Sequence, residues 1–421
     1  MKQAIKYLLK RLGLRIRISR LRENQNPGRL ASGSNQLDKP KRIELQDGTH
    51  ATFFGYHDKS PFSADNRRVL ACSVSGDDKL LETECSAMKV GYFEQSADGS
   101  FNTVFNEVAE TAAWSWQQGC MLQWNPAAPD REIVFNRLNG ERFGAVYYDI
   151  EKRSVVRELD HPAYALGPNG RFAASLNFTR LARLRPGYGY RKLEDPTLEM
   201  KAPKDDGLIL IDLKNGSGEL VVSLEELAAD TLREGDHYVN HATFSPDGEH
   251  IAFFHIYPDH RGGRIHRFYL YNIFGKELRL LEANRFVSHY CWLDDKNILT
   301  SEDGPGGYRA CLYDLERRQK SFVEIPQIGD FHPMAHPVNP GWVVADTKPD
   351  WKRRQHLFLF NIHSGKYVHL GSFLLPKGFD GPVRCDLHPR WDRKGHFIAS
   401  DTANGGRRKI ALLEIPKSLN L

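Results

Sequence analysis

The chain has no run of apolar residues long enough to cross a bilayer, so its sequence predicts no membrane-spanning helix. Its six cysteines are scattered without CxxC spacing, which excludes a zinc ribbon and a disulfide framework. The GxSxG, P-loop, GxGxxG and HExxH motifs are also missing, which excludes a serine-hydrolase elbow, a phosphate-binding loop and a zincin helix. Because no nucleotide-binding motif occurs, we expect no organic cofactor.

Methionine is scarce in the 421 residues, with five in total, whereas glycine occurs 35 times and aromatic residues make up 11%. Many glycines and aromatic residues with little methionine are typical of all-β repeat proteins, in which short strands alternate with turns. A chain of this length can bury a sizeable core in one large repeat domain or in two ordinary domains.

The net charge of +5 is unevenly distributed along the chain. Residues 1–22 carry eight of the 58 basic residues and no acidic one, which leaves 50 basic against 53 acidic residues elsewhere, or about −3. The part of the chain that can fold into a domain is therefore not a basic nucleic-acid binder, and we expect no nucleic-acid partner.

Residues 1–22 are not typical of a signal peptide, because lysine and arginine interrupt the apolar run and no small-residue cleavage site follows. Their leucines and isoleucines can share one face of a basic amphipathic helix, which would bind an anionic membrane surface at about 1 kcal/mol per basic residue. The alternative is a solvated basic tail. We expect a cytoplasmic protein, either free or peripheral at the inner membrane.

After a polar linker at residues 23–41, a loose repeat with a period near fifty begins at about residue 42. Each repeat opens on a turn such as FSPDG at 244–248, continues in an apolar strand and ends in a strand such as LYNI at 270–273. Seven such turns predict an all-β fold, a seven-bladed β-propeller over residues 42–416, followed by a C-terminal tail at 417–421. Residues 237–281 form one complete blade, and residues 42–45 are expected to supply a closing outer strand.

Five longer phrases carry a more specific likeness: FFGYHDKSP at 53–61, WQQGCMLQW at 116–124, LRPGYGY at 184–190, VNHA at 239–242 and CDLHPRW at 385–391. In this order they resemble the seven-bladed propellers grouped with oligogalacturonate lyase and, more remotely, the propeller ulvan lyases. The short repeat itself resembles TolB-type propellers. The likeness covers about residues 46–416 and implies β-elimination on uronate-containing glycans, with an acidic oligosaccharide or polysaccharide as the partner.

The resemblance also implies a manganese site built mainly from histidine. The matching positions are His289 and His388, while Asp386 stands where that family tends to place a further histidine, and His336 occupies the equivalent turn of the intervening blade. Three imidazoles and a carboxylate suit Mn²⁺ or another first-row divalent metal. The alternative is that these histidines only hydrogen-bond neighbouring strands at the blade turns.

The catalytic candidates lie in the LRPGYGY phrase and in the blade that follows it. Tyr188 and Tyr190 offer phenolic hydroxyls and stacking faces, Arg185 can pair bidentately with a uronate carboxylate, and His241 is a candidate base. Alternatively, the Tyr/Gly loop only packs over the channel mouth. The candidate substrate-binding residues are Arg137, Arg390, Arg407 and Gln118, whereas His237, His260 and His266 are expected at the surface.

The sequence is therefore consistent with two functions. The first is a lyase-like enzyme that cleaves uronate-containing glycans by β-elimination, with metal assistance. The second is a non-catalytic propeller that binds or scaffolds at the cytoplasmic face of the membrane, in cell-surface polysaccharide assembly. The ordered histidine, arginine and tyrosine phrases favour the first function. The basic N-terminus and the lack of an export signal are the grounds for the second, because a cytoplasmic lyase needs imported oligosaccharide.

Overall fold

The computed structural model describes residues 40–231, 235–260, 262–304, 306–326 and 328–419. The expected basic helix or tail at residues 1–22 lies outside the described residues, as does nearly all of the linker and the end of the C-terminal tail. Among the residues described, no helix is both long enough and apolar enough to span a membrane.

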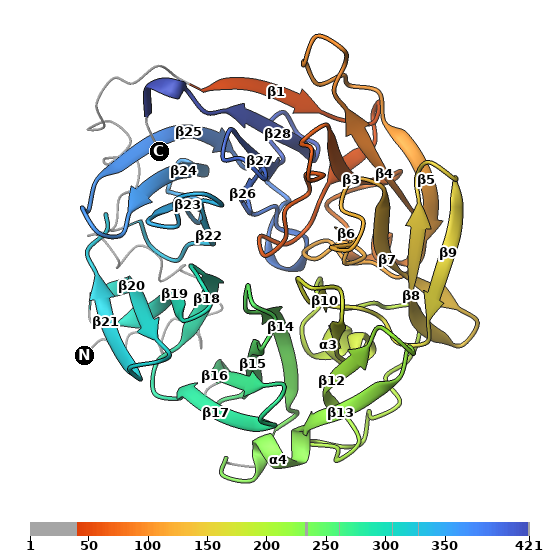
Figure 1. Ribbon diagram of the computed structural model, residues 1–421, viewed down its shortest axis with the longest axis vertical. Helices are drawn as coiled ribbons and strands as arrows, with labels where there is room; N and C mark the ends of the chain where they lie inside the picture. Colours follow the sequence, from red (N-terminus) through yellow and green to blue (C-terminus); the bar gives the residue numbers. More distant parts are fainter. Residues whose placement is uncertain (1–39, 232–234, 261, 305, 327, 420–421) are drawn as a thin grey trace, which may run out of the picture.

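Seven four-stranded antiparallel sheets stand around a central channel, as the sequence repeat predicts (Figure 1). The first blade contains β2 (Ala51–Phe53), β3 (Arg68–Val74), β4 (Met88–Glu94) and β5 (Asn106–Thr111). The second contains β6 (Gln123–Trp124), β7 (Glu132–Asn139), β8 (Arg142–Asp149) and β9 (Ser154–Leu159). The third contains β10 (Ala165–Leu166), β11 (Phe172–Ser175), β12 (Gly207–Asp212) and β13 (Gly218–Ser223).

The fourth blade contains β14 (Tyr238–Phe244), β15 (His250–Pro258), β16 (Arg264–Asn272) and β17 (Glu277–Glu282). The fifth contains β18 (Val287–Trp292), β19 (Asn297–Gly304), β20 (Gly307–Asp314) and β21 (Gln319–Val323). The sixth contains β22 (Pro333–Ala335), β23 (Trp342–Asp346), β24 (Arg354–Asn361) and β25 (Tyr367–Leu374). The seventh contains β26 (Arg390–Trp391), β27 (Phe397–Thr402), β28 (Lys409–Glu414) and β1 (Lys41–Leu45).

The fourth blade matches the complete blade expected at residues 237–281. Its FSPDG turn joins β14 to β15, and the Gly248 N–H donates to the Ser245 carbonyl oxygen at 2.9 Å. Gly248 has φ +76°, a left-handed conformation that glycine adopts without steric cost, so the marker residue and the turn geometry agree.

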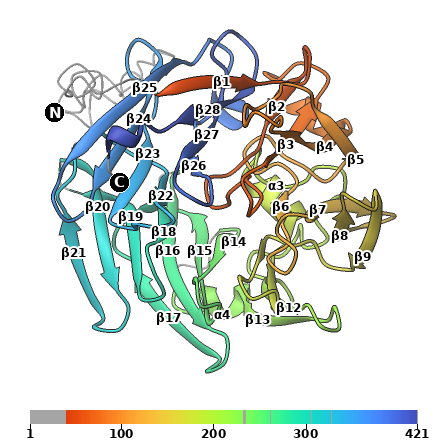
Figure 2. The ribbon, with the colours of Figure 1, turned by 45° about the horizontal axis from the view of Figure 1, so that its top comes forward.

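Ring closure is made by β1, the first strand of the described residues. β1 pairs antiparallel with β28, from Lys41 opposite Glu414 to Leu45 opposite Ile410, and so becomes the outer strand of the seventh blade (Figure 2). This confirms the closing strand expected at residues 42–45. Because a blade is too small to bury its own faces, this pairing ties the two ends of the repeat array together.

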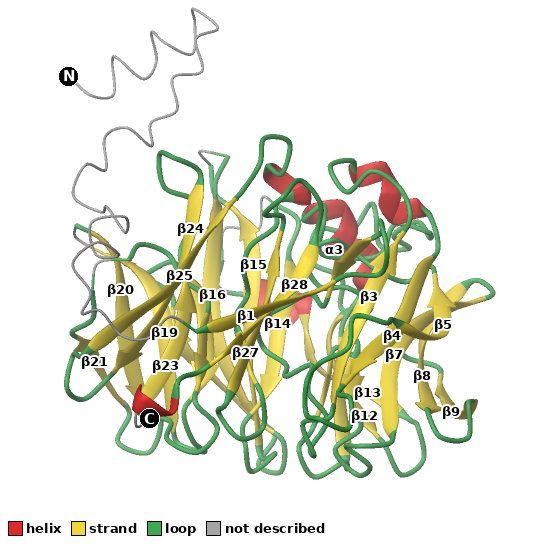
Figure 3. Cartoon of the chain, turned by 90° about the horizontal axis from the view of Figure 1, so that it is seen from above, coloured by secondary structure: helices red, strands yellow, loops and turns green. Residues whose placement is uncertain are grey.

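The short helices are insertions between strands. α3 (Phe178–Leu184) follows β11, and the Asn177 side chain caps it by accepting from the backbone N–H groups of Thr179 and Arg180. α3 lies on one face of the ring, at the top of Figure 3. The other helical segments among the described residues are α4 (Leu224–Ala228) and the 3-10 turns η2 (Leu81–Cys85), η3 (Gly381–Val383) and η4 (Lys417–Leu419).

Leu45→Ala tests the closing strand. Leu45 is fully buried in the core between the blades, so truncation should lower the free energy of unfolding by about 2–5 kcal/mol. Lys41→Ala, an exposed site on the same strand, should change it by less than about 0.5 kcal/mol. Urea unfolding of both variants is the measurement, and equal stability of the two would show that β1 does not hold the ring closed.

Candidate active site

The innermost strand of each blade is the first of its strands in the sheet order from the channel outward. In five blades, this strand or the segment next to it carries a histidine at the channel. Three of the five, His57, His332 and His388, precede or follow very short inner strands, while His241 and His289 lie within β14 and β18. We call these five residues the histidine cluster. Each is at most 4% exposed.

Tyr56 stands at the centre of the histidine cluster. Its ring centroid lies 4.7 Å from that of His57, 4.9 Å from His241 and 5.0 Å from His388. His332 lies 3.9 Å from His289 and 4.4 Å from His388, again between ring centroids. The five imidazoles therefore form one group, although they come from five different blades.

Hydrogen bonds at Nδ1 fix the tautomer of four of these imidazoles. His388 Nδ1 lies 2.7 Å from the Gly55 carbonyl oxygen, and His57 Nδ1 lies 3.1 Å from the Pro333 carbonyl oxygen. A carbonyl can only accept, so each Nδ1 carries the hydrogen and each Nε2 keeps its lone pair. Both Nε2 atoms are buried and have no hydrogen-bond partner, which is the arrangement of a metal-binding histidine.

Carboxylates fix the tautomers of His332 and His289 in the same way. His332 Nδ1 lies 2.7 Å from Asp346 Oδ1, and His289 Nδ1 lies 3.1 Å from Asp330 Oδ1. A carboxylate that accepts from Nδ1 orients the ring and raises the basicity of the opposite nitrogen. Since burial lowers the pKa of every imidazole in the cluster, these rings are neutral at neutral pH.

His241 differs from the other four because neither of its ring nitrogens has a hydrogen-bond partner. Its backbone has φ +55°, and the register of β14 against β15 shifts at this point, between Asn240 and Thr243. Such bulges redirect a side chain at a cost in backbone strain. His241 is thus a neutral, buried imidazole held in the channel by its backbone and by packing on Tyr290, whose ring lies 4.4 Å away between centroids.

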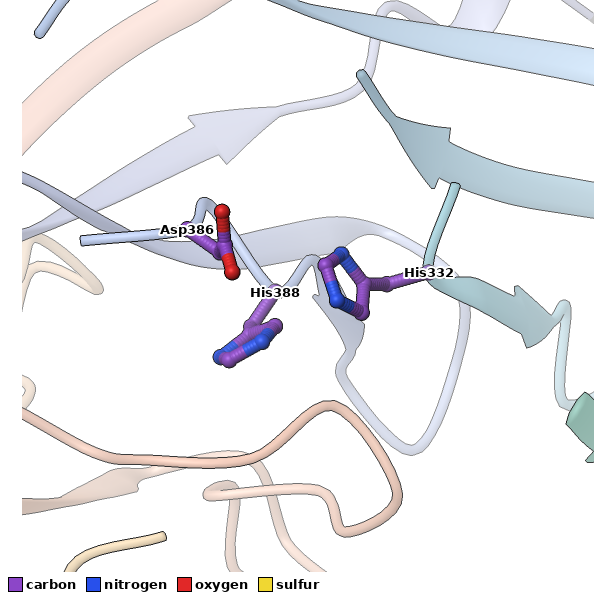
Figure 4. A group of neighbouring side chains, drawn as sticks. All are labelled: His332, Asp386 and His388. Atoms are coloured by element: carbon purple, nitrogen blue, oxygen red, sulfur yellow. The ribbon is translucent and has the colours of Figure 1, made fainter. Parts of the chain in front are cut away.

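Two histidines of this cluster and one carboxylate form a group that could hold a metal ion, which we call the metal-binding group. Ligand atoms of His332, Asp386 and His388 all lie within 4.8 Å of one another, and the three side chains face a common point in Figure 4. Two neutral imidazoles and a carboxylate fit a first-row divalent cation. The buried, unpartnered His388 Nε2 supports this fit, because such an atom is costly to bury without a ligand.

The other two predicted ligands, His289 and His336, lie in different places. His289 joins the histidine cluster, next to His332. His336 does not: its Nδ1 accepts from the backbone N–H groups of Val338 and Asn339, and its ring packs on Trp391 at 4.7 Å between centroids. His336 therefore stabilises a blade turn, and His332, four residues earlier, occupies the channel in its place.

The sequence does contain a signal for His332. Residues 330–333 read DFHP and residues 386–389 read DLHP, so two successive blades repeat the same phrase before their inner strands. The repeat pairs His332 with His388 and Asp330 with Asp386. His57 has a weaker signal, since it only follows Tyr56 in the GYHD phrase.

Three cations lie next to the cluster. Arg185, Lys348 and Arg384, which we call the cationic rim, are half-buried, whereas the five imidazoles are buried. Asp386 accepts from Arg384 Nε at 2.7 Å and from Lys348 Nζ at 3.2 Å. Burial raises the pKa of Asp386, but these two cations outweigh that effect and hold it well below its usual range.

Tyr188 lies between the two arginines of the rim. Its hydroxyl oxygen accepts from Arg384 Nη2 at 2.5 Å and from Arg185 Nη2 at 3.2 Å, and its ring lies 4.2 Å below the Arg185 guanidinium. Burial raises its pKa, but the two guanidinium groups prevail and lower it to about 8. The two arginine N–H groups occupy lone pairs of this oxygen, so its own hydrogen remains free for another acceptor.

The rest of the LRPGYGY phrase supports Tyr188. Gly187 has φ +90°, and a Cβ atom there would lie 2.5 Å from the Pro382 carbonyl oxygen, so only glycine lets the loop approach η3 this closely. Tyr190, predicted to be catalytic, instead stacks on Phe178 at 4.2 Å between centroids, and its hydroxyl accepts from Asn136. Its role in this structure is to anchor the loop on α3.

The side chains of the predicted substrate-binding residues are bound to other groups of the protein. Arg390 is fully buried and donates to the Tyr56 carbonyl oxygen and to Asp401, so it holds the wall rather than a ligand. Arg137 pairs with Glu158, and Arg407 donates to the Gly76 carbonyl oxygen. Gln118 is buried and donates to the Tyr164 hydroxyl at 2.7 Å, with its Oε1 unpartnered.

The structure also corrects the surface positions expected for two other histidines. His237 is fully buried and hydrogen-bonds His255, while His266 is 4% exposed and donates from Nδ1 to the Val287 carbonyl oxygen. Neither belongs to the histidine cluster.

No family model and no curated protein matches this chain. Among solved structures, an oligogalacturonate lyase in complex with manganese superposes with a TM-score of 0.62 at 14% identity, covering 91% of this chain and all of its own (100%). An oligogalacturonate lyase from Vibrio parahaemolyticus gives 0.59 at 12% identity, covering 90% and 98%. The tricorn protease gives 0.55 at 12% identity, but only 35% of that chain is covered. At these identities the likeness shows the fold, a propeller of the oligogalacturonate lyase shape.

His332→Ala tests which histidine binds metal. Removing a ligand with its oriented lone pair should weaken binding of Mn²⁺ to the purified protein by more than about 10–100-fold, the cost of losing a supporting residue alone. His336→Ala should leave the affinity unchanged, because that side chain bonds the backbone of its blade turn and packs on Trp391. Isothermal titration of both variants is the measurement, and a loss confined to His336→Ala would restore the assignment made from the sequence.

Proposed function

We propose that this protein cleaves uronate-containing acidic oligosaccharides by β-elimination. The observation that carries the proposal is the contact of the cationic rim with a cluster of buried, neutral imidazoles, of which His57, His241 and His388 have a ring nitrogen without a partner among the described residues. Further support comes from the shape shared with oligogalacturonate lyase, one of whose structures contains manganese. A rim of two arginines and a lysine favours an anionic sugar over a neutral one.

The elimination needs three things from the protein, and the channel offers each of them. Positive charge must stabilise the uronate carboxylate while the C5 proton leaves, which is the task of Arg185, Arg384 and Lys348. A metal ion held by His332, Asp386 and His388 would supply further Lewis-acid stabilisation of that carboxylate. A base must accept the C5 proton, and an acid must protonate the leaving oxygen.

We assign the base to His241 and the acid to Tyr188. His241 is neutral and both its nitrogens lack a partner, so Nδ1 or Nε2 can accept the C5 proton. The electron pair of the C5–H bond then forms the C4–C5 double bond as the C4–O bond breaks. The leaving oxygen takes the hydroxyl hydrogen of Tyr188, and the resulting phenolate is stabilised by Arg185 and Arg384.

Access to these groups requires movement of the rim. Tyr188 and His241 are each 1% exposed, whereas the side chains of Lys348 and Arg384 are 36% and 25% exposed. An acidic sugar therefore meets the three cations first. Since the side chains of Lys348 and Arg384 are long and partly exposed, we infer that they turn outward with the bound carboxylate when the sugar reaches His241.

Tyr188→Phe tests the assignment of the acid. It removes the hydroxyl hydrogen and should lower the rate of product formation by about 10²–10⁴-fold, the usual contribution of a positioned acid. Tyr190→Phe is the matched control, because that hydroxyl only bonds Asn136, and its rate should stay near that of the unmodified protein. The assay follows the ultraviolet absorbance of the unsaturated uronate from galacturonate, guluronate and glucuronate polymers, with and without Mn²⁺. No unsaturated product from any of them would overturn the proposed function.

The pH dependence of the rate provides a second test. Tyr188 can donate only while protonated, and its pKa lies at about 8, so the rate should fall as pH rises through about 8. His241 has its pKa well below the usual histidine value, so loss of the base should appear only at acidic pH. A rate that instead increases through pH 8 would show that the phenolate of Tyr188 is the base.

A further inference from the structure

Lys348 occupies an unusual place for a lysine, beside the atoms that fit a metal ion. It follows β23 in the turn that leads to β24, and its Nζ lies 3.2 Å from Asp386 Oδ2 and 3.5 Å from His332 Nε2. Asp330 Oδ2 lies 4.0 Å away. Lys348 thus contacts two of the three residues of the metal-binding group.

A metal ion and this ammonium cannot hold the same atoms together. A first-row ion bound to a carboxylate oxygen and an imidazole nitrogen lies about 2.0–2.2 Å from each. Both atoms now face the Lys348 ammonium, so an ion bound there would lie in contact with a second positive charge. The lone pair of His332 Nε2 can also serve only one of them at a time.

The surroundings of Lys348 allow it to leave. Its side chain is 36% exposed, and a flexible four-carbon stem lets the ammonium reach solvent. Asp386 does not lose all compensation when this happens, because Arg384 Nε remains bound to it at 2.7 Å. His332 likewise keeps its orientation, since Asp346 holds Nδ1 from the other side.

We propose that Lys348 is a built-in competitor for the metal: its ammonium contacts atoms that would bind a divalent cation, and it must swing out before the cation binds. This inference rests on the metal-binding group used in the proposed function, but not on the elimination reaction itself. Its consequence is that the chain binds metal more weakly than its ligand set alone would allow.

The test is a titration of the full chain with Co²⁺ at constant pH, followed by the visible absorption of the bound ion. Lys348→Met keeps the length of the side chain and removes its charge, and it should bind Co²⁺ about 10–100-fold more tightly than the unmodified protein, the range over which neighbouring groups change metal affinity. Lys348→Arg keeps the charge and should remain a weak binder. Lys352→Met, an exposed site in the same turn, should leave the affinity unchanged.

Equal affinity of the unmodified protein and Lys348→Met would overturn the inference, as would weaker binding by the variant or no binding by either. If Lys348→Met does not fold, Lys348→Gln replaces it with the same expected result. The outcome is separate from that of the lyase assay. If the variant binds Co²⁺ more tightly but no unsaturated product forms, the role of Lys348 stands and the elimination is rejected. If product forms but the affinity does not change, the elimination stands and the role of Lys348 is rejected.

Discussion

The site depends on the contact between the seventh and the first blade. His388 donates to the Gly55 carbonyl oxygen across 333 residues of sequence, and Asp401 accepts from the backbone N–H groups of Phe54 and Gly55. These bonds fix the segment that carries Tyr56 and His57, the residues around which the other imidazoles gather. Because the histidine cluster draws on five blades, it exists only while the ring is closed, and β1 is the strand that closes it.

The closed ring also offsets the free-energy cost of burying these imidazoles in strained conformations. Neutral imidazoles with unpartnered nitrogens are costly to bury, and His241 and His388 adopt positive φ values in addition. Such features persist only where the surrounding structure determines them fully. Here the blades on either side supply that constraint, so the strained residues stay aligned with each other instead of relaxing toward separate hydrogen bonds.

The blades could be predicted from the sequence because their turns are local. The FSPDG turn needs only its own residues to form, and seven related turns were enough to give the number of blades. The site is different, because its residues meet through the ring. Both His332 and His336 lie in the phrase FHPMAHP, and which of them enters the channel depends on where β22 begins. That boundary is set by pairing with β23.

The same reason explains Arg390 and Lys348. An arginine in the DLHPRW phrase is expected beside a ligand, yet the direction of its guanidinium is decided by Asp401, eleven residues further along the chain. Lys348 carries no signal at all in its own segment, since its partner Asp386 lies 38 residues away in the next blade. Short-range patterns indicate which residues are polar. They do not indicate which of those residues share a site.

Asp386 links the metal, the rim and the substrate through one carboxylate. In the structure it forms ion pairs with both Lys348 and Arg384. If a divalent ion displaces Lys348, the ion adds two positive charges at Asp386. The Lys348 ammonium, a third positive charge, then turns toward solvent. The channel then presents more positive charge to an acidic sugar both at its mouth and at its base. Because binding free energies are reciprocal, an acidic sugar that engages Lys348 at the rim must in turn favour metal binding at Asp386. The competition therefore couples the two ligands instead of merely weakening one.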